Sequence, residues 1–417
     1  MKDSLSIQAP ETLQVRINLP ASKSISNRAL MINALSHSKI QPENVSDCDD
    51  TRVMLAALDT LPEVVDIGAA GTAMRFLTAY FSVNSGTHIM TGSERMRHRP
   101  IRILVDALRQ LGADIRYEGE DGFPPLRITG NPQMTGGELV LPGDVSSQYI
   151  SALLMIGPTL AKGLRLRLTG EIVSRPYLDM TVTMMREFGA QVAWEGDHVL
   201  QVSPQPYQPR PYVIENDWSA ASYWYEMVAL SRDAHAEVVL PGLRIDSTQG
   251  DSQVASIFKE LGVVTEYFQE LDGTEALRLR HGGKKTCSLN CDFTRVPDLA
   301  QTVAVTSALL DIPFRFNGLQ TLRIKETDRI SAIQQELDKL GYKIETTDST
   351  MEWKGVRSRE DSELDTRIAT YEDHRMAMAF APACLCLPQV HILHPEVVSK
   401  SYPTYWDDLR KARFLCI

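Results

Sequence analysis

The sequence predicts an α/β (α+β) protein whose chain forms two similar lobes, each built from several βα units. Four segments share one pattern, in which a polar start leads into an amphipathic helix, a glycine and two short strands. The helix-ending glycines Gly112, Gly189, Gly262 and Gly341 stand 77, 73 and 79 residues apart. Because this spacing exceeds that of the usual solenoid repeats, each repeat must contain more than one helix.

Two interleaved sets of helices are expected along the chain. The four repeat segments are residues 99–130, 175–204, 251–280 and 326–355. In each segment the glycine suits the C′ position of a helix, and Pro100 and Pro176 suit N1. The other helices are expected to begin near Ser22, Thr72, Ser147, Ser219, Asp298 and Asp373. The Pro-rich residues 206–217 suit a linker between the lobes.

Composition and charge narrow the class of protein. The chain has 417 residues, 43% hydrophobic and 23% charged, with a formal net charge of −10. This charge disfavours binding to nucleic acid or to an acidic membrane surface. The first residues lack the apolar core of a signal peptide, and the longest apolar runs are too short to span a bilayer, so we expect a cytoplasmic protein. The six cysteines lack zinc-site spacing, and we expect no metal and no cofactor.

Cations recur at the starts of predicted helices, where the helix dipole disfavours them. Lys23 and Arg28 follow the plausible N-cap Ser22, and the other cases are Arg75, Lys325 with Arg329, Arg375, and Lys400. A single case is best read as a solvated helix start. Five cases in an acidic chain indicate a site for phosphate or carboxylate groups, which would turn each local cost into a gain.

Polar and acidic residues accompany these cations. Ser146, Ser147 and Gln148 begin one helix, and Ser174 and Tyr177 begin another; such groups bind hydroxyls and phosphates but also cap helices. Two residues have alternative readings. Asp298 is either an N-cap or a general base, and His374 is either a packed or capping residue or a catalyst.

Several motifs, in order along nearly the whole chain, resemble those of the 5-enolpyruvylshikimate-3-phosphate (EPSP) synthase family. They are "LPASKSISNRAL", "GAAGTAMR", "GDVSSQY", "SRPYLDMT", "VPDLAQT", "RIKETDR", "YEDHRMAM" and "SKSYPTY". The resemblance implies a two-lobed inside-out α/β barrel with three βαβαββ repeats per lobe. The N-terminal lobe would be residues 21–214, mainly for shikimate 3-phosphate. Residues 1–20 and 215–417 would form the C-terminal lobe, which completes the phosphoenolpyruvate site and the catalytic cleft.

The resemblance also implies the reaction. The enolpyruvyl group of phosphoenolpyruvate would pass to the 5-hydroxyl of shikimate 3-phosphate by addition and elimination through a tetrahedral intermediate. Phosphate would be released, in the shikimate pathway of aromatic amino acid biosynthesis. The substrates are the only implied partners, the enzyme would be a monomer, and the family is the target of glyphosate.

The site residues are carried over motif by motif. Asp298 would be the base, with Lys23 and Glu326 as alternative proton donors at the methylene group. Shikimate 3-phosphate would be bound by Lys23, Ser24, Arg28, Ser146, Ser147, Gln148, Ser174, Tyr177, Asp298 and Lys325. Phosphoenolpyruvate would be bound by Lys23, Gly71, Thr72, Arg95, Gln148, Arg329, His374, Arg375 and Lys400.

Four positions depart from the family pattern, and three other classes compete with it. Ala69, Phe76, Arg175 and Thr321 stand where Asn, Pro, Lys and Asn are common, which bears on substrate affinity and glyphosate sensitivity.

The related UDP-N-acetylglucosamine enolpyruvyl transferases usually carry a loop cysteine, which "GSERMRHRP" lacks. A non-catalytic descendant would lose the proton-transfer groups first, yet all three remain. Net charge disfavours a related RNA-end-processing enzyme.

Overall fold

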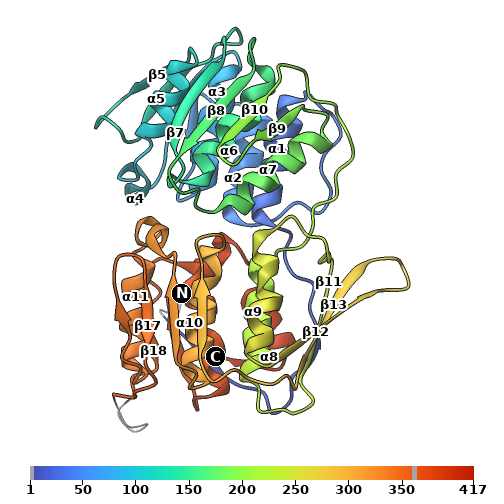
Figure 1. The fold of residues 1–417 in the computed structure, drawn as a ribbon, viewed down its shortest axis with the longest axis vertical. Helices are drawn as coiled ribbons and strands as arrows, with labels where there is room; N and C mark the ends of the chain where they lie inside the picture. Colours follow the sequence, from blue (N-terminus) through green and yellow to red (C-terminus); the bar gives the residue numbers. More distant parts are fainter. Residues whose placement is uncertain (1–3, 359–363) are drawn as a thin grey trace. The chain divides into compact units, whose positions relative to one another are not determined.

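The structure, a computed structural model, describes residues 4–358 and 364–417, and the chain divides into two compact units. The N-terminal unit is Ala21–Ile214, and the C-terminal unit combines the residues up to Pro20 with Glu215–Ile417. The second crossing between units falls within the Pro-rich residues 206–217. Both labelled chain ends lie in the C-terminal unit (Figure 1).

The N-terminal unit contains two four-stranded sheets. The first has the order β3 (Val64–Asp66), β4 (Thr87–Thr91), β6 (Leu126–Thr129), β5 (Asp114–Tyr117). The second has the order β7 (Gly137–Pro142), β8 (Leu164–Thr169), β10 (Val199–Val202), β9 (Val192–Glu195). The helices are α1 (Lys23–Leu35), α2 (Asp49–Thr60), α3 (Gly71–Val83), α4 (Glu94–Arg97), α5 (Arg102–Gln110), α6 (Ser147–Ile156) and α7 (Arg175–Glu187).

The C-terminal unit contains three four-stranded sheets. Their orders are β12 (Val263–Gln269), β13 (Glu275–His281), β11 (Glu237–Pro241), β2 (Gln14–Arg16); β14 (Leu289–Asp292), β15 (Phe314–Asn317), β17 (Met351–Trp353), β16 (Glu345–Thr346); and β18 (Arg367–Ile368), β19 (Val390–Leu393), β1 (Ser4–Gln8), β20 (Leu415–Cys416). The α-helices are α8 (Trp218–Leu230), α9 (Val254–Glu260), α10 (Ala300–Leu309), α11 (Arg329–Lys339), α12 (His374–Phe380) and α13 (Tyr405–Lys411). Short 3₁₀ helices include η2 (Gly250–Gln253), η3 (Pro297–Leu299), η4 (Gln320–Ile324), η6 (Ala381–Leu385) and η7 (Pro395–Lys400).

All five sheets share one topology, which confirms the mixed α/β class and explains the sequence repeats. In each sheet one pair of strands is parallel and the two other pairs are antiparallel. A helix crosses between the parallel strands, for example α6 between β7 and β8, because parallel strands need such a connection. The N-terminal segment supplies β1 to one sheet and β2 to another.

The two units differ in how many sheets they contain. Three repeats per lobe were expected, and the C-terminal unit has three sheets among its described residues. The N-terminal unit has two sheets, and outside them its elements include α1, α2 and a single parallel bridge between Glu43 and Val213. A third sheet, as three repeats would require, is not found in residues 21–214, which the structure describes throughout.

Each crossover helix is buried on nearly all sides, which matters for the residues at its start. Every residue of α3, α10 and α12 is buried. In α1 burial extends beyond the predicted apolar positions to Ser26, Asn27 and Arg28, so the reading of this helix start as solvated is wrong for Arg28. Polar side chains at these starts are therefore held in a protein interior.

The turn that ends each repeat helix has the predicted backbone. Gly112, Gly189, Gly262 and Gly341 have φ angles of 105°, 84°, 92° and 84°, a region that glycine enters without strain. Pro176 lies in the first turn of α7, but at the second position and not at N1, because the helix begins at Arg175. The prediction for Pro100 is wrong, because α5 begins at Arg102 with Ile101 as its N-cap.

Candidate active site

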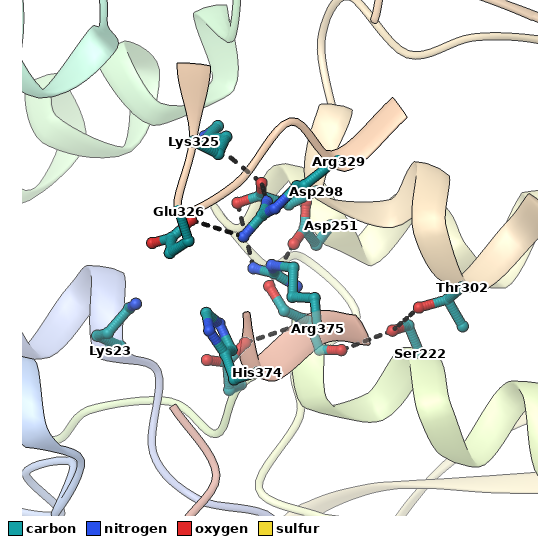
Figure 2. A network of polar contacts seen from close by, with 12 residues as sticks. Lys23, Ser222, Asp251, Asp298, Thr302, Lys325, Glu326, Arg329, His374 and Arg375 are labelled. Carbon is teal, nitrogen blue, oxygen red and sulfur yellow. Dashed lines mark hydrogen bonds and ion pairs between the residues drawn. The ribbon is translucent and has the colours of Figure 1, made fainter. Parts of the chain in front are cut away.

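Charged residues of the C-terminal unit gather where three helices begin. Asp298 lies in η3, just before α10, and Arg375 lies in the first turn of α12. Lys325 and Glu326 precede α11, which Arg329 begins. Because α10 packs against both α11 and α12, these helix starts bring their charged side chains together around Asp298 (Figure 2).

Arg329 is the centre of this cluster. Its side chain is 2% exposed, and three carboxylates accept its N–H groups. Nε donates to Oδ2 of Asp373 at 2.6 Å, Nη1 to Oδ1 of Asp298 at 3.0 Å, and Nη2 to Oε2 of Glu326 at 2.9 Å. Although burial lowers the pKa of Arg329, the three carboxylates together raise it above the ordinary value. The guanidinium therefore stays charged and holds the acids in place.

Two further cations contact Asp298. Nη2 of Arg375 donates to Oδ2 of Asp298 at 3.1 Å, and Nζ of Lys325 lies 3.5 Å from Oδ1. Burial raises the pKa of Asp298, but Arg375, Lys325 and Arg329 outweigh it and hold that pKa well below its usual range. The N-cap reading is wrong, because Asp298 lies inside η3, whose N-cap is Val296, while the N-cap of α10 is Leu299. It is an ionised carboxylate surrounded by cations.

Lys400 and His374 complete the predicted residues of this unit. Nζ of Lys400 lies 3.0 Å from Oε1 of Glu326, so each oxygen of that carboxylate faces a cation. His374 is buried at the start of α12, and its Nδ1 lies 3.7 Å from Oδ1 of Asp373. Asp373 caps α12 through the backbone N–H of Arg375 while it pairs with Arg329.

Asp251, in η2, joins the cluster although the sequence did not single it out. It is buried, and the hydroxyl of Ser219 donates to its Oδ2. Figure 2 shows Asp251 beside Asp298 and Arg375. Burial and the negative charge of Asp298 raise the pKa of Asp251 to about 6, against the opposing effect of Arg375. A local signal existed, since Asp251 opens the third repeat segment.

The N-terminal unit places its predicted cations at the start of α1. Lys23 is the first residue of this helix, and its Nζ lies 3.8 Å from Oδ2 of the buried Asp50. Arg28, one turn later, is 2% exposed and donates from Nη1 to the backbone oxygen of Ser24 at 2.9 Å. Its Nη2 lies 3.4 Å from the backbone oxygen of Tyr177. Ser24, Arg28 and Tyr177 are thus brought together.

A second group lies where α3 and α6 begin. Nε2 of Gln148 donates to Oγ1 of Thr72 at 3.2 Å, and Ser146 caps α6 by accepting the N–H of Gln148. Gly71 begins α3, and a side chain there would have to displace two guanidinium groups: a Cβ atom would lie 2.8 Å from Nη1 of Arg99 and 3.0 Å from Nη1 of Arg75. Two guanidinium groups therefore border the Gly71 backbone, as expected for an anion site.

The remaining predicted residues lie on the same unit. Ser147 begins α6, and Arg95 lies in α4 after the N-cap Ser93. Ser174 precedes α7 in a left-handed conformation with φ of 58°. No side-chain capping bond explains this backbone at Ser174.

Comparisons with known proteins decide the family. The family model for EPSP synthase (3-phosphoshikimate 1-carboxyvinyltransferase) matches residues 7–65 and 59–409. A 3-phosphoshikimate 1-carboxyvinyltransferase of Bacteroides fragilis is 57% identical over 409 residues, which is 98% of this chain and 97% of the relative. The chain belongs to the EPSP synthase family. Its activity is therefore that of an enolpyruvyl transferase of aromatic amino acid biosynthesis.

More distant relatives agree. The protein of the same name from Bordetella pertussis is 37% identical over 433 residues, covering 97% of this chain and 96% of the relative. An EPSP synthase structure from Acinetobacter baumannii has a similar fold, with a TM-score of 0.79 at 23% identity, and the match covers 99% of this chain and 100% of that one.

Three further features of this EPSP synthase family member are its possible metal ligands, the character of its helices and the residues that depart from the family pattern. Among residues 4–358 and 364–417, no group of three or more His, Cys, Asp or Glu side chains could hold a metal ion. Over the same residues, the helices are too short or too polar to cross a membrane. Two of the departing residues have aromatic contacts: the Phe76 ring lies 5.4 Å from Cζ of Arg28, and the Arg175 guanidinium lies 4.3 Å from the Trp194 ring.

Proposed function

We propose that this chain transfers the enolpyruvyl group of phosphoenolpyruvate to the 5-hydroxyl of shikimate 3-phosphate, with Asp298 as the base. The observation that carries this proposal is the ionised Asp298 among Lys325, Arg329 and Arg375, in a chain of the EPSP synthase family. Both substrates are polyanions, and a cationic cluster of this kind suits them.

The same proposal includes the finer architecture and setting. Each lobe would be an inside-out α/β arrangement of three βαβαββ repeats; the three sheets of the C-terminal unit and their shared topology support this, whereas the N-terminal unit has two sheets. The protein would act as a cytoplasmic monomer without a cofactor or nucleic acid, which its net charge of −10 supports.

The proposed roles divide by unit and substrate. Lys23, Ser24, Arg28, Ser146, Ser147, Gln148, Ser174 and Tyr177 of the N-terminal unit would bind shikimate 3-phosphate, with Asp298 and Lys325 of the C-terminal unit. Lys23, Gly71, Thr72, Arg95 and Gln148 would bind phosphoenolpyruvate, with Arg329, His374, Arg375 and Lys400. The contacts of Arg28 with Ser24 and of Gln148 with Thr72 support this grouping.

The chemistry would run in two steps. Asp298 accepts the proton of the 5-hydroxyl of shikimate 3-phosphate. At the same time the hydroxyl oxygen bonds to the central enol carbon of phosphoenolpyruvate, and the methylene carbon gains a proton. The resulting tetrahedral intermediate then loses a proton from its new methyl group and expels phosphate, which restores the carbon–carbon double bond. Positioned acid and base groups typically contribute about 10²–10⁴-fold each to such a reaction.

The low pKa of Asp298 makes it a weak base before substrate binds. Arg375, Lys325 and Arg329 are the groups that lower this pKa. Substrate phosphate and carboxylate groups would compete for the same cations, weaken their hold on Asp298 and raise its pKa. Asp298 would therefore be ionised before substrate binds, and it would become a stronger base only when substrate is present.

Between the two alternative proton donors, the contacts favour Lys23. Both oxygens of Glu326 face cations, so an added proton would have to displace Arg329 or Lys400. Lys23 is a proton donor as it stands, with Asp50 at 3.8 Å as its charged neighbour. Glu326 would then act by holding Arg329 and Lys400 in place.

A phosphate-release assay tests the proposed function. With phosphoenolpyruvate and shikimate 3-phosphate both present, we expect phosphate release together with a product whose mass equals shikimate 3-phosphate plus the enolpyruvyl group. Omitting either substrate should abolish the signal. Release with UDP-N-acetylglucosamine as acceptor, and not with shikimate 3-phosphate, would contradict the proposal and indicate the related transferase.

A further inference from the structure

We propose that Ser151 and Thr181 are positioning residues that fix the Arg28 guanidinium for shikimate 3-phosphate, an inference that rests on the proposed function. Ser151 lies in α6 and Thr181 in α7, and both are fully buried. Neither residue is among the site residues that the motifs indicate, although Thr181 ends the motif "SRPYLDMT". Their contacts with Arg28 join three helices of the N-terminal unit.

The two hydroxyls form a consistent chain of hydrogen bonds. Thr181 donates its hydroxyl proton to the backbone oxygen of Tyr177 at 2.7 Å, so its oxygen accepts elsewhere. Nε of Arg28 donates to this oxygen at 2.7 Å, and Ser151 lies 2.9 Å away. With Ser151 as donor to Thr181, its own oxygen accepts from Nη2 of Arg28 at 3.1 Å. Every proton in the chain has one acceptor.

This arrangement occupies all but one of the N–H groups of Arg28. Nε contacts Thr181, Nη2 contacts Ser151 and the Tyr177 carbonyl, and one N–H of Nη1 contacts the Ser24 carbonyl. The other N–H of Nη1 has no acceptor among the described residues. Because a guanidinium is planar, fixing Nε and Nη2 also fixes the direction of this remaining donor.

The charge of Arg28 is not balanced in the way that the charge of Arg329 is. Arg329 contacts three carboxylates, whereas no carboxylate among residues 4–358 and 364–417 lies within 4.0 Å of the Arg28 nitrogens. Burial lowers the pKa of Arg28 to about 10, so it is still charged at neutral pH. A buried cation held only by hydroxyls, carbonyls and rings is suited to an anionic ligand.

Two aromatic rings complete the surroundings of this guanidinium. The Phe76 and Tyr177 rings lie 5.4 Å and 5.9 Å from Cζ of Arg28. These rings stabilise a cation without neutralising it. The hydroxyls supply direction and the rings supply packing, so loss of a hydroxyl should change ligand binding more than folding.

The test measures shikimate 3-phosphate binding by calorimetry, and kcat at saturating substrate, for the full chain. Thr181→Val keeps the shape but cannot accept from Arg28. We expect its Kd for shikimate 3-phosphate to rise by about fivefold or more while kcat stays within about threefold. Thr181→Ser, which keeps the hydroxyl, should restore binding to within about threefold, and Ser151→Ala should weaken it in the same direction.

Thr78→Val is the matched control. Thr78 is also fully buried, and its hydroxyl donates to the carbonyl four residues earlier, that of Met74, at 2.6 Å, as Thr181 does to Tyr177. The Kd for shikimate 3-phosphate and the melting temperature of Thr78→Val should show the cost of losing a hydroxyl–carbonyl hydrogen bond that does not involve Arg28. A Thr181→Val Kd that changes by less than about fivefold, or no more than that of Thr78→Val, overturns the inference.

The assays separate failure of this inference from failure of the proposed function. Wild-type protein that binds shikimate 3-phosphate but releases no phosphate with phosphoenolpyruvate contradicts the function and leaves the binding comparison valid. Wild-type protein that turns over, with unchanged binding in Thr181→Val, contradicts only the inference. Wild-type protein that neither binds nor turns over contradicts both.

Discussion

The Nε atom of Arg329 donates to Oδ2 of Asp373 at 2.6 Å, and both side chains are buried. Asp373 also caps α12 through the N–H of Arg375, so a single carboxylate links the starts of α11 and α12. The Arg329 guanidinium and the Arg375 backbone are therefore held by the same acid. This link explains how separate repeats place their charges around Asp298.

The first prediction concerns this pair. Asp373→Asn keeps an oxygen for the α12 cap but removes the charge opposite Arg329, and we expect a loss of about 3 kcal/mol in the free energy of unfolding. Urea denaturation measures it. Lys354→Met, which breaks the exposed 2.6 Å pair with Glu345, should have no measurable effect. A loss below about 1 kcal/mol in Asp373→Asn would mean that the pair does not organise the cluster.

The second prediction concerns pH and Asp251. Its pKa is raised to about 6 in the folded protein, against about 3.9 in an unfolded chain. Between these values the folded state binds the extra proton, so the stability contribution of Asp251 falls as pH rises from about 4 to about 6 and stays low above that. Near pH 4 the folded carboxyl is protonated and the unfolded one is about half protonated, so the contribution is still within about 0.5 kcal/mol of zero.

Asp251→Asn removes this titration. The free energy of unfolding of the variant should lie within about 0.5 kcal/mol of that of the wild type near pH 4 and exceed it by on the order of 2–3 kcal/mol at pH 7.5. Denaturant titrations at both pH values provide the measurement. A difference between variant and wild type that is the same at both pH values would show that folding does not raise the pKa of Asp251.

The third prediction concerns Gly71. In Gly71→Ala the new Cβ must displace Nη1 of Arg99 and of Arg75, which are the ends of flexible side chains. We therefore expect a melting temperature close to that of the wild type and a KM for phosphoenolpyruvate raised by about tenfold. Gly119→Ala, where the new Cβ would lie 3.7 Å from Cδ of Pro125, is the control. An unchanged KM would remove Gly71 from the proposed phosphoenolpyruvate site.

Local sequence signals explain how much of the fold and site was predictable. Helix starts depend on residues within one turn, and the caps Asp328 and Asp373 lie beside Arg329 and Arg375 in sequence. The repeat-ending glycines have the backbone that such positions require. The cationic cluster of the C-terminal unit could therefore be inferred from the positions of Lys325, Arg329 and Arg375.

Contacts between distant segments could not be predicted in this way. Thr181 meets Arg28 across 153 positions, and Asp251 meets Ser219 across 32. A serine or threonine inside a helix carries no local sign that it faces a buried arginine. The low pKa of Asp298 likewise depends on three cations from two segments that are distant from it in sequence, and the repeat spacing does not reveal that the N-terminal unit has two sheets.

Turnover of Asp298→Asn tests the central claim most directly, because asparagine keeps the size of the side chain but cannot accept the proton. Thermal melting first establishes that the variant is folded, and kcat is then measured with both substrates saturating. The proposed role of Asp298 as the base predicts a fall in kcat of about 10²–10⁴-fold. A folded variant that keeps more than about a tenth of wild-type kcat would contradict that role and transfer it to Glu326 or Lys23.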